Sequence, residues 1–272
     1  MNNTPLASVV LANYNGSQFL KEAIESVCAQ SFRDFEFIVV DDGSTDNSRA
    51  IMDEMAARDS RIVRLYLPQN GGLPNALNAG IKEAKGKYIV RMDGDDICLP
   101  QRFERQVAYM ERAENEKVGV CGTFCEVIDT SGKSLGPKRF AENDKDIRRM
   151  FWFRNPIQHS TSIIRKKCFE ELGGYDTNFP QSQDYELWFR FGQKYELHNL
   201  PEILLKYRVH GENAILKRQK STIRGVLLAR KYAVTKYGYK MPFSGRVFSW
   251  LTNVTYVLPA RLVFVIFQWM QK

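Results

Sequence analysis

An apolar run that ends in closely spaced carboxylates constrains this chain more than any other feature. The run Lys87-Tyr88-Ile89-Val90 is typical of a buried β-strand and leads into Arg91-Met92-Asp93-Gly94-Asp95-Asp96. Crowded, buried carboxylates are costly and raise one another's pKa, so a fold tolerates them where a cation lies between them. Hard oxygen ligands suit Mg²⁺ or Mn²⁺, which in turn hold phosphates. The run therefore predicts a metal–diphosphate site, with a solvated Asp/Gly turn as the alternative.

The first half of the chain alternates apolar runs with stretches of helical periodicity. This alternation predicts an α/β fold with a mainly parallel sheet covered by helices on both faces. The expected strands are 8–12, 35–40, 61–67 and 87–92, and the expected helices are 19–28, 47–58 and 74–84.

Polar clusters follow three of these strands. They are Asn13-Tyr14-Asn15, Asp41-Asp42 and the carboxylates of 93–96. Ligands of parallel α/β sheets bind at the carboxyl ends of the strands. Three clusters at that edge favour a binding site over a solvated turn.

The second half of the chain is less regular. Residues 129–140 read as a loop-rich segment and 172–176 as a turn. We expect helices over 100–113, 144–152 and from Gln183 onward, and strands over 118–128 and 161–164.

The five cysteines and the polar N-terminus favour a reducing, cytoplasmic setting. The cysteine count is odd and no signal-peptide pattern precedes the first strand. Cys121 and Cys125 are four residues apart, but no His or Cys cluster follows at zinc-site spacing. We therefore expect neither a disulfide framework nor a zinc site.

Positive charge is concentrated near the C-terminus. From residue 201 onward there are 13 Lys and Arg residues and two acids, so this part carries +11 in a chain of net charge +8. Residues 247–270 are apolar and aromatic but interrupted by Asn253, Pro259 and Arg261, and no charge-free run is long enough to span a membrane. A segment lying in the membrane interface fits better, with Trp250, Tyr256 and Trp269 near the headgroups. A helix packed on the domain is the alternative, and no nucleic-acid-binding motif is present.

Five motifs in order resemble the family 2 glycosyltransferases. They are Ser8-Val9-Val10-Leu11-Ala12-Asn13-Tyr14-Asn15, Val40-Asp41-Asp42-Gly43-Ser44-Thr45-Asp46, Asn70 to Ile81, Met92-Asp93-Gly94-Asp95-Asp96 and Gln183-Asp184-Tyr185-Glu186-Leu187-Trp188. The resemblance covers roughly residues 6–212. It implies a GT-A domain over 1–212, a nucleotide-sugar donor and inversion at the anomeric carbon, and it leaves 213–272 as a basic, aromatic helical segment.

The resemblance also implies roles for individual residues around the donor. Asp93 and Asp95 match the family's metal-binding Asp-x-Asp, with Asp95 as the direct ligand of Mn²⁺ or Mg²⁺, and Asp96 would orient the donor sugar. Asp42 or its neighbour Asp41 would accept the uracil N–H, while an Asx turn or helix cap is the alternative role for this pair. The remaining donor-pocket residues are Ala12, Asn13, Tyr14, Asn75 and Gly94.

Asp184 matches the acidic position that serves as the general base in the family, with Gln183 in place of the usual Glu. Capping of the following helix is the alternative. Arg208 is expected to pair a phosphate and His210 to complete the metal shell. His159 is expected near the acceptor, and for both histidines and Arg208 structural packing remains open.

Two features narrow the expected function. Ala76-Leu77-Asn78 lacks the Arg of many family members, and the Gln-x-x-Arg-Trp signature of processive synthases is absent. The missing signature favours a single transfer over polymerisation. The basic, aromatic tail motivates a lipid-linked (undecaprenyl-diphosphate) glycan as the acceptor for the UDP-sugar, on the inner face of the cytoplasmic membrane, in O-antigen or capsule assembly. The alternatives are a protein or soluble glycan acceptor with a tail that forms a homodimer, and a non-catalytic nucleotide-sugar-binding module.

Overall fold

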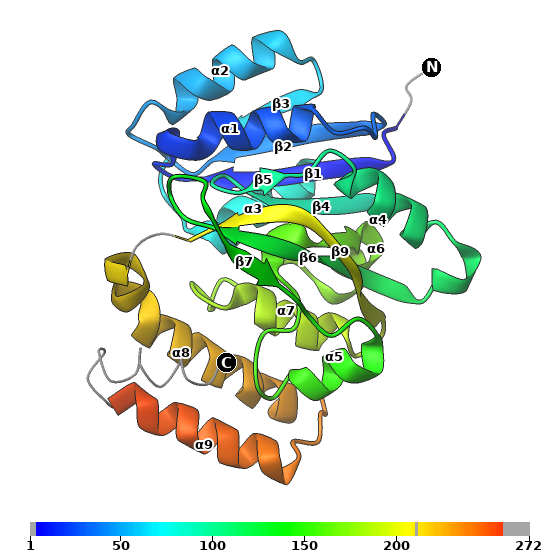
Figure 1. The fold of residues 1–272 in the computed structure, drawn as a ribbon, viewed down its shortest axis with the longest axis vertical. Coiled ribbons are helices and arrows are strands. Elements are labelled where there is room, and N and C mark those ends of the chain that lie inside the picture. The colour runs from blue at the N-terminus through cyan, green and yellow to red at the C-terminus, as the bar shows by residue number, and fades with distance from the viewer. Residues whose placement is uncertain (1–3, 210–211, 258–272) are drawn as a thin grey trace.

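The computed structural model describes residues 4–209 and 212–257 (Figure 1). The first half alternates strands and helices as predicted. Its elements are β1 (Ala7–Asn13), α1 (Ser17–Cys28), β2 (Phe35–Asp41), α2 (Ser48–Arg58), β3 (Ile62–Tyr66), α3 (Leu73–Glu83) and β4 (Tyr88–Asp93).

The second half supplies further strands to the same sheet and four helices that pack beside it. Two helical segments then complete the described chain. The elements are β5 (Ile97–Cys98), α4 (Arg102–Met110), β6 (Val118–Ile128), β7 (Ser134–Lys138), α5 (Asp144–Met150), β8 (Ile163–Arg165), α6 (Lys166–Leu172), α7 (Gln183–Phe191), β9 (Glu196–Arg208), α8 (Glu212–Thr235) and α9 (Phe243–Val257).

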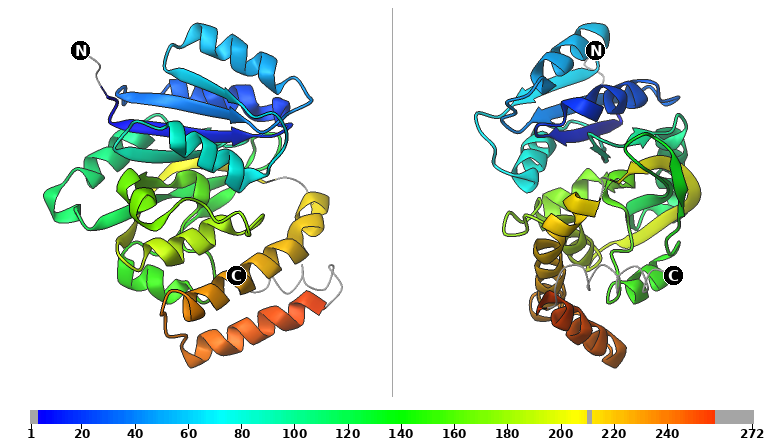
Figure 2. Two further views of the ribbon diagram at one scale, coloured as in Figure 1. Left: turned by 180° about the vertical axis from the view of Figure 1, so that it is seen from behind. Right: turned by 60° about the vertical axis from the view of Figure 1, so that its left-hand side comes forward.

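One sheet runs through the molecule in the order β3-β2-β1-β4-β8-β6-β9-β5, and β7 pairs with β6. The strands β3, β2, β1 and β4 are parallel, as the alternation predicts. From β4 onward the sheet is mixed, because β8 runs antiparallel to both β4 and β6. The long strand β9, yellow in Figure 2, curves across the sheet and pairs with both β6 and β5.

Helices cover both faces of the parallel part because successive side chains of a strand point to opposite faces. Val9 and Leu11 of β1 lie in the hydrophobic core under α1, α2 and α4. Val10, between them, lies in the core formed with α3, α6 and α7. Both faces of these strands are therefore apolar, and the polar residues are left to the strand ends.

The prediction of a loop over 129–140 is wrong, because this stretch contains β7. Asp129 accepts hydrogen bonds from the backbone N–H groups of Ser131 and Lys133, and Gly132 adopts φ +85°, so the chain reverses and pairs with β6. The strand Ser134–Lys138 is largely exposed. It lacks the apolar alternation that marks a half-buried strand in a sequence.

The C-terminal helices pack on the domain in part. α8 lies against α7, and α9 lies against α8 (Figure 1). Arg230 of α8 is buried and donates to the Tyr185 hydroxyl on α7 and to Thr252 on α9. Among the helices described, none is both long and apolar enough to cross a membrane.

Candidate active site

The carboxyl ends of β1, β2 and β4 bring the predicted donor residues into one row. Strand register pairs Asn13 with Asp41 and Ala12 with Asp93. A Cβ on Gly94 would lie 3.5 Å from Oδ1 of Asn13, so the backbone after β4 runs close to β1. Tyr14 follows at the mouth of the row and is half exposed. The sheet therefore places four of the predicted residues side by side.

The loops after β1 and β2 are held together by Asn15 and Ser44. The backbone N–H of Asn15 donates to Oγ of Ser44 at 2.9 Å, and Oδ1 of Asn15 accepts from the backbone N–H of Thr45 at 2.8 Å. Asn15 adopts φ 50°, a conformation that Asn tolerates better than most residues. Two polar loops thus form one wall.

Asp41 and Asp42 are both buried but have different partners. Oδ2 of Asp41 accepts from Arg49 at 2.7 Å, while its Oδ1 is buried without a hydrogen-bond partner among the described residues. The two oxygens of Asp42 accept the backbone N–H groups of Gly71 and Gly72 at 2.9 and 2.8 Å. Asp42 therefore fixes the turn before α3, and Oδ1 of Asp41 remains an unused hydrogen-bond acceptor.

Asn75 lies on the turn that Asp42 fixes. It is exposed in the first turn of α3 and donates to the Gly71 carbonyl at 2.5 Å. Asn75 therefore lies beside the buried acid Asp42. This position is compatible with the predicted role of Asn75 at the nucleotide, which stays a prediction.

The predicted acidic cluster is anchored by buried basic residues. Nη2 of Arg91, whose side chain is 1% exposed, pairs with Oδ1 of Asp93, which is 26% exposed. Burial raises the pKa of Asp93, Arg91 opposes that rise, and Asp95 adds to it. Burial raises the pKa of Asp96 well above its usual range, and Asp93 and Asp95 add to the rise. The three carboxylates are thus close enough to repel one another.

Arg208, the last residue of β9, is tied to the segment that carries Asp95 and Asp96. Its backbone N–H donates to Oδ1 of Asp96 at 2.8 Å, and its Nε donates to the Asp95 carbonyl at 2.8 Å. Its Nη2 pairs with Glu22 of α1 at 2.6 Å. Arg208 therefore positions the acidic turn. To contact a phosphate, its guanidinium group would have to break the ion pair with Glu22.

Asp184 lies in the first turn of α7, facing this cluster. Asn155 donates to its Oδ2 at 2.6 Å, and backbone N–H groups of the first helical turn also donate to its carboxylate, so the capping role remains an alternative. Burial raises the pKa of Asp184 to about 6; the hydrogen bond from Asn155 opposes the rise and the charge of Asp93 adds to it. A carboxylate with this pKa is ionised at pH 7 and basic enough to take a proton.

His159 contacts aromatic side chains and is neutral. Its Nε2 lies 2.7 Å from the Tyr175 hydroxyl, and its ring meets that of Trp188 edge-on. Burial lowers the pKa of His159 well below its usual range, and Arg91 adds to the effect. Its contacts are those of a packing residue, while His210 lies outside the described residues.

Lys138 was missed by sequence motifs and becomes visible only in the fold. It ends β7, donates to Oε1 of Gln158 at 3.0 Å, and interacts electrostatically with Asp184 and Asp96. The residue as a whole is exposed, yet burial of its ammonium lowers the pKa of Lys138. Selecting Lys138 requires knowing that β7 pairs with β6, because a lysine in a segment that reads as an exposed loop has no sequence pattern that marks it as functional.

The residues that could hold a divalent ion are Asp93 and Asp95. Within residues 4–209 and 212–257, no three His, Cys, Asp or Glu side chains converge as a preformed metal cage. The cluster nevertheless fits a cation, since Oδ2 of Asp96 is buried without a hydrogen-bond partner in the same part of the chain. Burial raises the pKa values of Asp93 and Asp96, and the neighbouring carboxylates add to both rises. Carboxylate oxygens suit Mn²⁺ and Mg²⁺.

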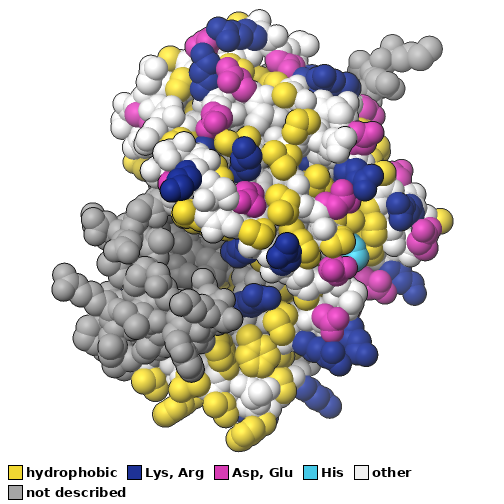
Figure 3. All heavy atoms as spheres, viewed as in Figure 1, with side chains coloured by type: hydrophobic (Ala, Val, Ile, Leu, Met, Phe, Trp, Pro, Cys, Tyr) yellow, Lys and Arg dark blue, Asp and Glu magenta, His cyan; other side chains and the backbone are white. Residues whose placement is uncertain are grey.

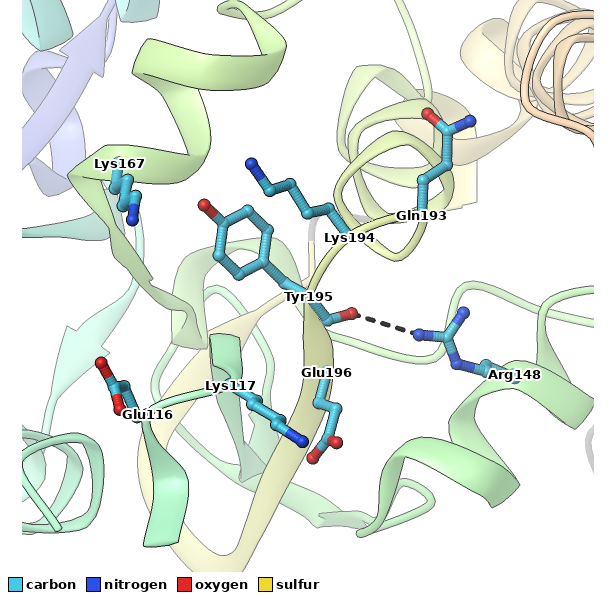
Figure 4. A pocket seen from close by; sticks show the side chains of 8 residues that line it. All are labelled: Glu116, Lys117, Arg148, Lys167, Gln193, Lys194, Tyr195 and Glu196. Carbon is cyan, nitrogen blue, oxygen red and sulfur yellow. Dashed lines mark hydrogen bonds between the residues drawn. The ribbon is translucent and has the colours of Figure 1, made fainter. Parts of the chain in front are cut away.

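A separate pocket of about 410 Å³ lies at the opposite end of β6 and β9 (Figure 4). It is lined by Lys117, Arg148, Lys167 and Lys194, among others. Arg148 is held by Asp144 and by the Tyr195 carbonyl, and Lys194 pairs with Glu171. None of the acidic residues of 93–96 lines this pocket.

Two solved structures have a similar fold. Residues 1–349 of Staphylococcus aureus TarS in complex with UDP-GlcNAc match with a TM-score of 0.65 at 19% identity, over 85% of this chain and 68% of that one. The mannosyltransferase PcManGT from Pyrobaculum calidifontis, in complex with GDP-Man and Mn²⁺, matches with a TM-score of 0.64 at 15% identity, over 99% of this chain and 81% of that one. The fold is the GT-A fold.

Sequence comparisons show the family to which this chain belongs. The model of glycosyl transferase family 2 matches residues 8–173. An uncharacterized glycosyltransferase of Haemophilus influenzae is 34% identical over 220 residues, which are 78% of this chain and 68% of that protein. The amylovoran biosynthesis glycosyltransferase AmsE of Erwinia amylovora is 30% identical over 264 residues, 94% of this chain and 96% of AmsE. The chain belongs to glycosyl transferase family 2.

Proposed function

We propose that the protein is an inverting, metal-dependent glycosyltransferase that moves one sugar from a UDP-sugar to a hydroxyl of a lipid-linked glycan in bacterial polysaccharide synthesis. The observation that carries this proposal is the position of Asp184, which faces the acidic cluster closely enough for Asp93 to raise its pKa. A donor on the cluster and an acceptor on Asp184 would place the leaving group and the attacking hydroxyl on opposite sides of the transferred sugar. That arrangement favours single displacement with inversion.

Asp184 is the proposed general base. Its carboxylate, held by Asn155, would accept the proton of the acceptor hydroxyl as the hydroxyl oxygen attacks the anomeric carbon. The bond from that carbon to the donor's diphosphate oxygen breaks in the same step. UDP leaves with the bonding electrons, and the proton remains on Asp184 until solvent removes it.

Asp95 and Asp93 are the proposed ligands of Mn²⁺ or Mg²⁺, with Asp96 oriented toward the donor sugar. Such an ion, when bound, offsets the charge that develops on the leaving diphosphate. Arg91 fixes the orientation of Asp93, and Arg208 fixes the backbone of Asp95. The Mn²⁺ bound to PcManGT supports a metal in this fold.

UDP is proposed as the nucleotide because TarS binds UDP-GlcNAc on a similar fold. The nucleotide wall would be Ala12, Asn13, Tyr14 and the buried acids of β2. Oδ1 of Asp41, which has no partner among the described residues, is the acceptor best placed for the uracil N–H. Asp42 would act through the turn that it holds and through Asn75 beside that turn.

The acceptor and the location are proposed from AmsE and from the C-terminal helices. AmsE is named for amylovoran biosynthesis, which supports a polysaccharide product. Exposed apolar residues on α9, within a basic part of the chain, support peripheral contact with the inner face of the cytoplasmic membrane, where a lipid-linked acceptor would be found. No nucleic-acid partner is proposed, and self-association through α9 is the alternative use of the same surface.

Calorimetric titration of UDP tests the donor site. We expect the wild type to bind UDP at least ten-fold more tightly with Mn²⁺ than without it, and Asp95→Asn to lose that difference. Asp34→Asn, which removes an exposed carboxylate far from the acidic cluster in sequence, is the matched control and should behave as the wild type. Failure of the wild type to bind UDP would overturn the choice of nucleotide, and equal binding with and without Mn²⁺ would overturn the metal. The anomeric configuration of the product, measured by NMR, would test inversion.

A further inference from the structure

A pocket of about 450 Å³ lies between the end of β7 and α5. Lys and Arg side chains are visible over this part of the molecule in Figure 3. The lining includes three arginines and one acid, together with apolar side chains; the residues used below are Arg139, Phe140, Asp146, Arg149, Met150 and Arg154.

Two of the three guanidinium groups are not neutralised. Among the residues that the structure describes, Arg139 and Arg154 have neither a hydrogen-bond acceptor nor an ion-pair partner for their side chains, and both are exposed. Arg149 pairs with Asp146 at 3.0 Å, and the amide of Asn143 also donates to Asp146. The pocket therefore presents excess positive charge with open donor positions.

Two arginines of the pocket are sequence neighbours of residues that interact with the proposed base Asp184. Arg154 precedes Asn155, the residue that donates to Asp184. Arg139 follows Lys138, which interacts electrostatically with Asp184 and with Arg154. Nζ of Lys138 also lies 5.4 Å from the ring centroid of Phe140, a buried residue that lines the pocket.

The pocket at the other end of the sheet differs in how its cations are used. There Arg148 is paired with Asp144, and Lys167 and Lys194 are both paired with Glu171. The first two of these pairs lie within α5 and α6, and Lys194 joins the segment after α7 to α6. Charge at Arg139 and Arg154 has no such structural use in the described chain.

We infer that the pocket of Arg139, Arg149 and Arg154 binds a phosphate or diphosphate group of the acceptor. Guanidinium groups match phosphate oxygens with paired, charge-assisted hydrogen bonds. Phe140 and Met150 supply an apolar wall for the first carbons of a lipid attached to that phosphate. The inference rests on the proposed function, because it gives the acceptor of Asp184 its anionic anchor.

Calorimetry with farnesyl diphosphate, on full-length protein saturated with UDP and Mn²⁺, tests this site. Saturation keeps the diphosphate probe out of the donor site. We expect the wild type to bind farnesyl diphosphate but not farnesol, and Arg139→Gln/Arg154→Gln to bind it at least ten-fold more weakly. Lys117→Gln/Lys167→Gln, which removes two positive charges from the other pocket, is the matched control and should bind as the wild type does.

Each outcome separates this inference from the proposed function. Binding of inorganic pyrophosphate as tight as that of farnesyl diphosphate supports the site and attributes the affinity to phosphate alone. Equal binding of farnesol, undiminished binding by the double arginine variant, or an equal loss in the lysine control overturns the inference. Loss of UDP binding in the same samples would instead indicate failure of the proposed function.

Discussion

Asn155 donates a 2.6 Å hydrogen bond to Oδ2 of Asp184 across 29 residues of sequence. The bond joins the segment before the short 3₁₀ helix His159–Thr161 to the first turn of α7. A hydrogen bond to the charged form of a carboxyl group favours that form. Asn155 therefore limits the rise that burial imposes on the pKa of Asp184, which is about 6.

Replacing Asn155 with Ala should shift the acid limb of the kcat–pH profile to higher pH. Loss of one hydrogen bond to a charged group costs about 1.5 kcal/mol, which corresponds to roughly one pH unit. Turnover measured from pH 5 to pH 9 would show the shift. Asn178→Ala, which removes a side-chain bond to Asp176 in an exposed turn, is the control. An unchanged acid limb in Asn155→Ala would show that Asp184 does not control turnover.

Asp184→Asn should reduce kcat by about 10³-fold or more while leaving UDP affinity within about two-fold of the wild type. The amide keeps the shape of the side chain and can accept the bond from Asn155, but it cannot take a proton. Single-turnover kinetics and UDP titration on the same preparation separate the two effects. Comparable losses of turnover and UDP affinity would point to a binding role for Asp184 instead.

The same substitution should make the protein more stable at pH 7. The pKa of Asp184 in the folded protein, about 6, lies above its usual value of 3.8. For a carboxyl group with a raised pKa, stability is fully present below pH 4 and is lost as the pH rises through 6. Asp184→Asn removes this loss, so its free energy of unfolding should exceed that of the wild type by about 1–3 kcal/mol at pH 7 and by little at pH 4. Urea titrations at the two pH values measure the difference, and an equal gain at both would contradict a titration effect.

Asn78→Ala should destabilise the fold by about 2 kcal/mol, because it leaves two backbone groups without partners. Its side chain donates to the Tyr175 carbonyl and accepts from the Tyr175 N–H, both at 2.8 Å. A Cβ on Gly174 would lie 2.4 Å from Oδ1 of Asn78, so this contact also requires glycine there. Urea unfolding measures the effect, with exposed Asn75→Ala as the control. A loss no greater than that of the control would show that water replaces the two bonds.

The parallel half of the fold could be predicted because its strands are buried on both faces. Val9, Val10 and Leu11 are all apolar for this reason, and the first hydrophilic residues mark the strand ends. In the mixed half, the strands expected over 118–128 and 161–164 correspond to β6 and β8. Strand β7 escaped prediction, since it is exposed and its pairing with β6 depends on backbone groups that carry no sequence signal.

The candidate site, too, could be predicted only in part. The acids at 93–96 and Asp184 stand out because carboxylates next to buried segments are unusual. The partners Asn155 and Lys138 come from segments that only the folded chain brings near Asp184. Arg208 was expected at a phosphate, but its hydrogen bonds to the Asp95 carbonyl and to Glu22 are long-range and could not be read from the sequence.

Trp250→Ser/Leu251→Ser should weaken binding to vesicles that contain anionic lipid by at least ten-fold. Exposed apolar residues on α9 follow helical spacing and share one face: Phe243, Val247, Trp250, Leu251 and Val254. The opposite face packs on the domain, where Phe248 meets Phe153 and Thr252 is buried. Burying one large apolar side chain contributes about 1.5–3 kcal/mol, so losing two should exceed a ten-fold change.

Vesicle co-sedimentation provides the measurement, and Val63→Ser/Leu135→Ser is the matched control. These two residues are 42% and 58% exposed and lie on β3 and β7, away from α9, so their loss should leave vesicle binding unchanged. Sedimentation velocity without vesicles tests the alternative use of the same face. If the wild type forms a dimer that Trp250→Ser/Leu251→Ser abolishes while vesicle binding is the same for all three proteins, α9 joins two copies of the chain and does not contact lipid.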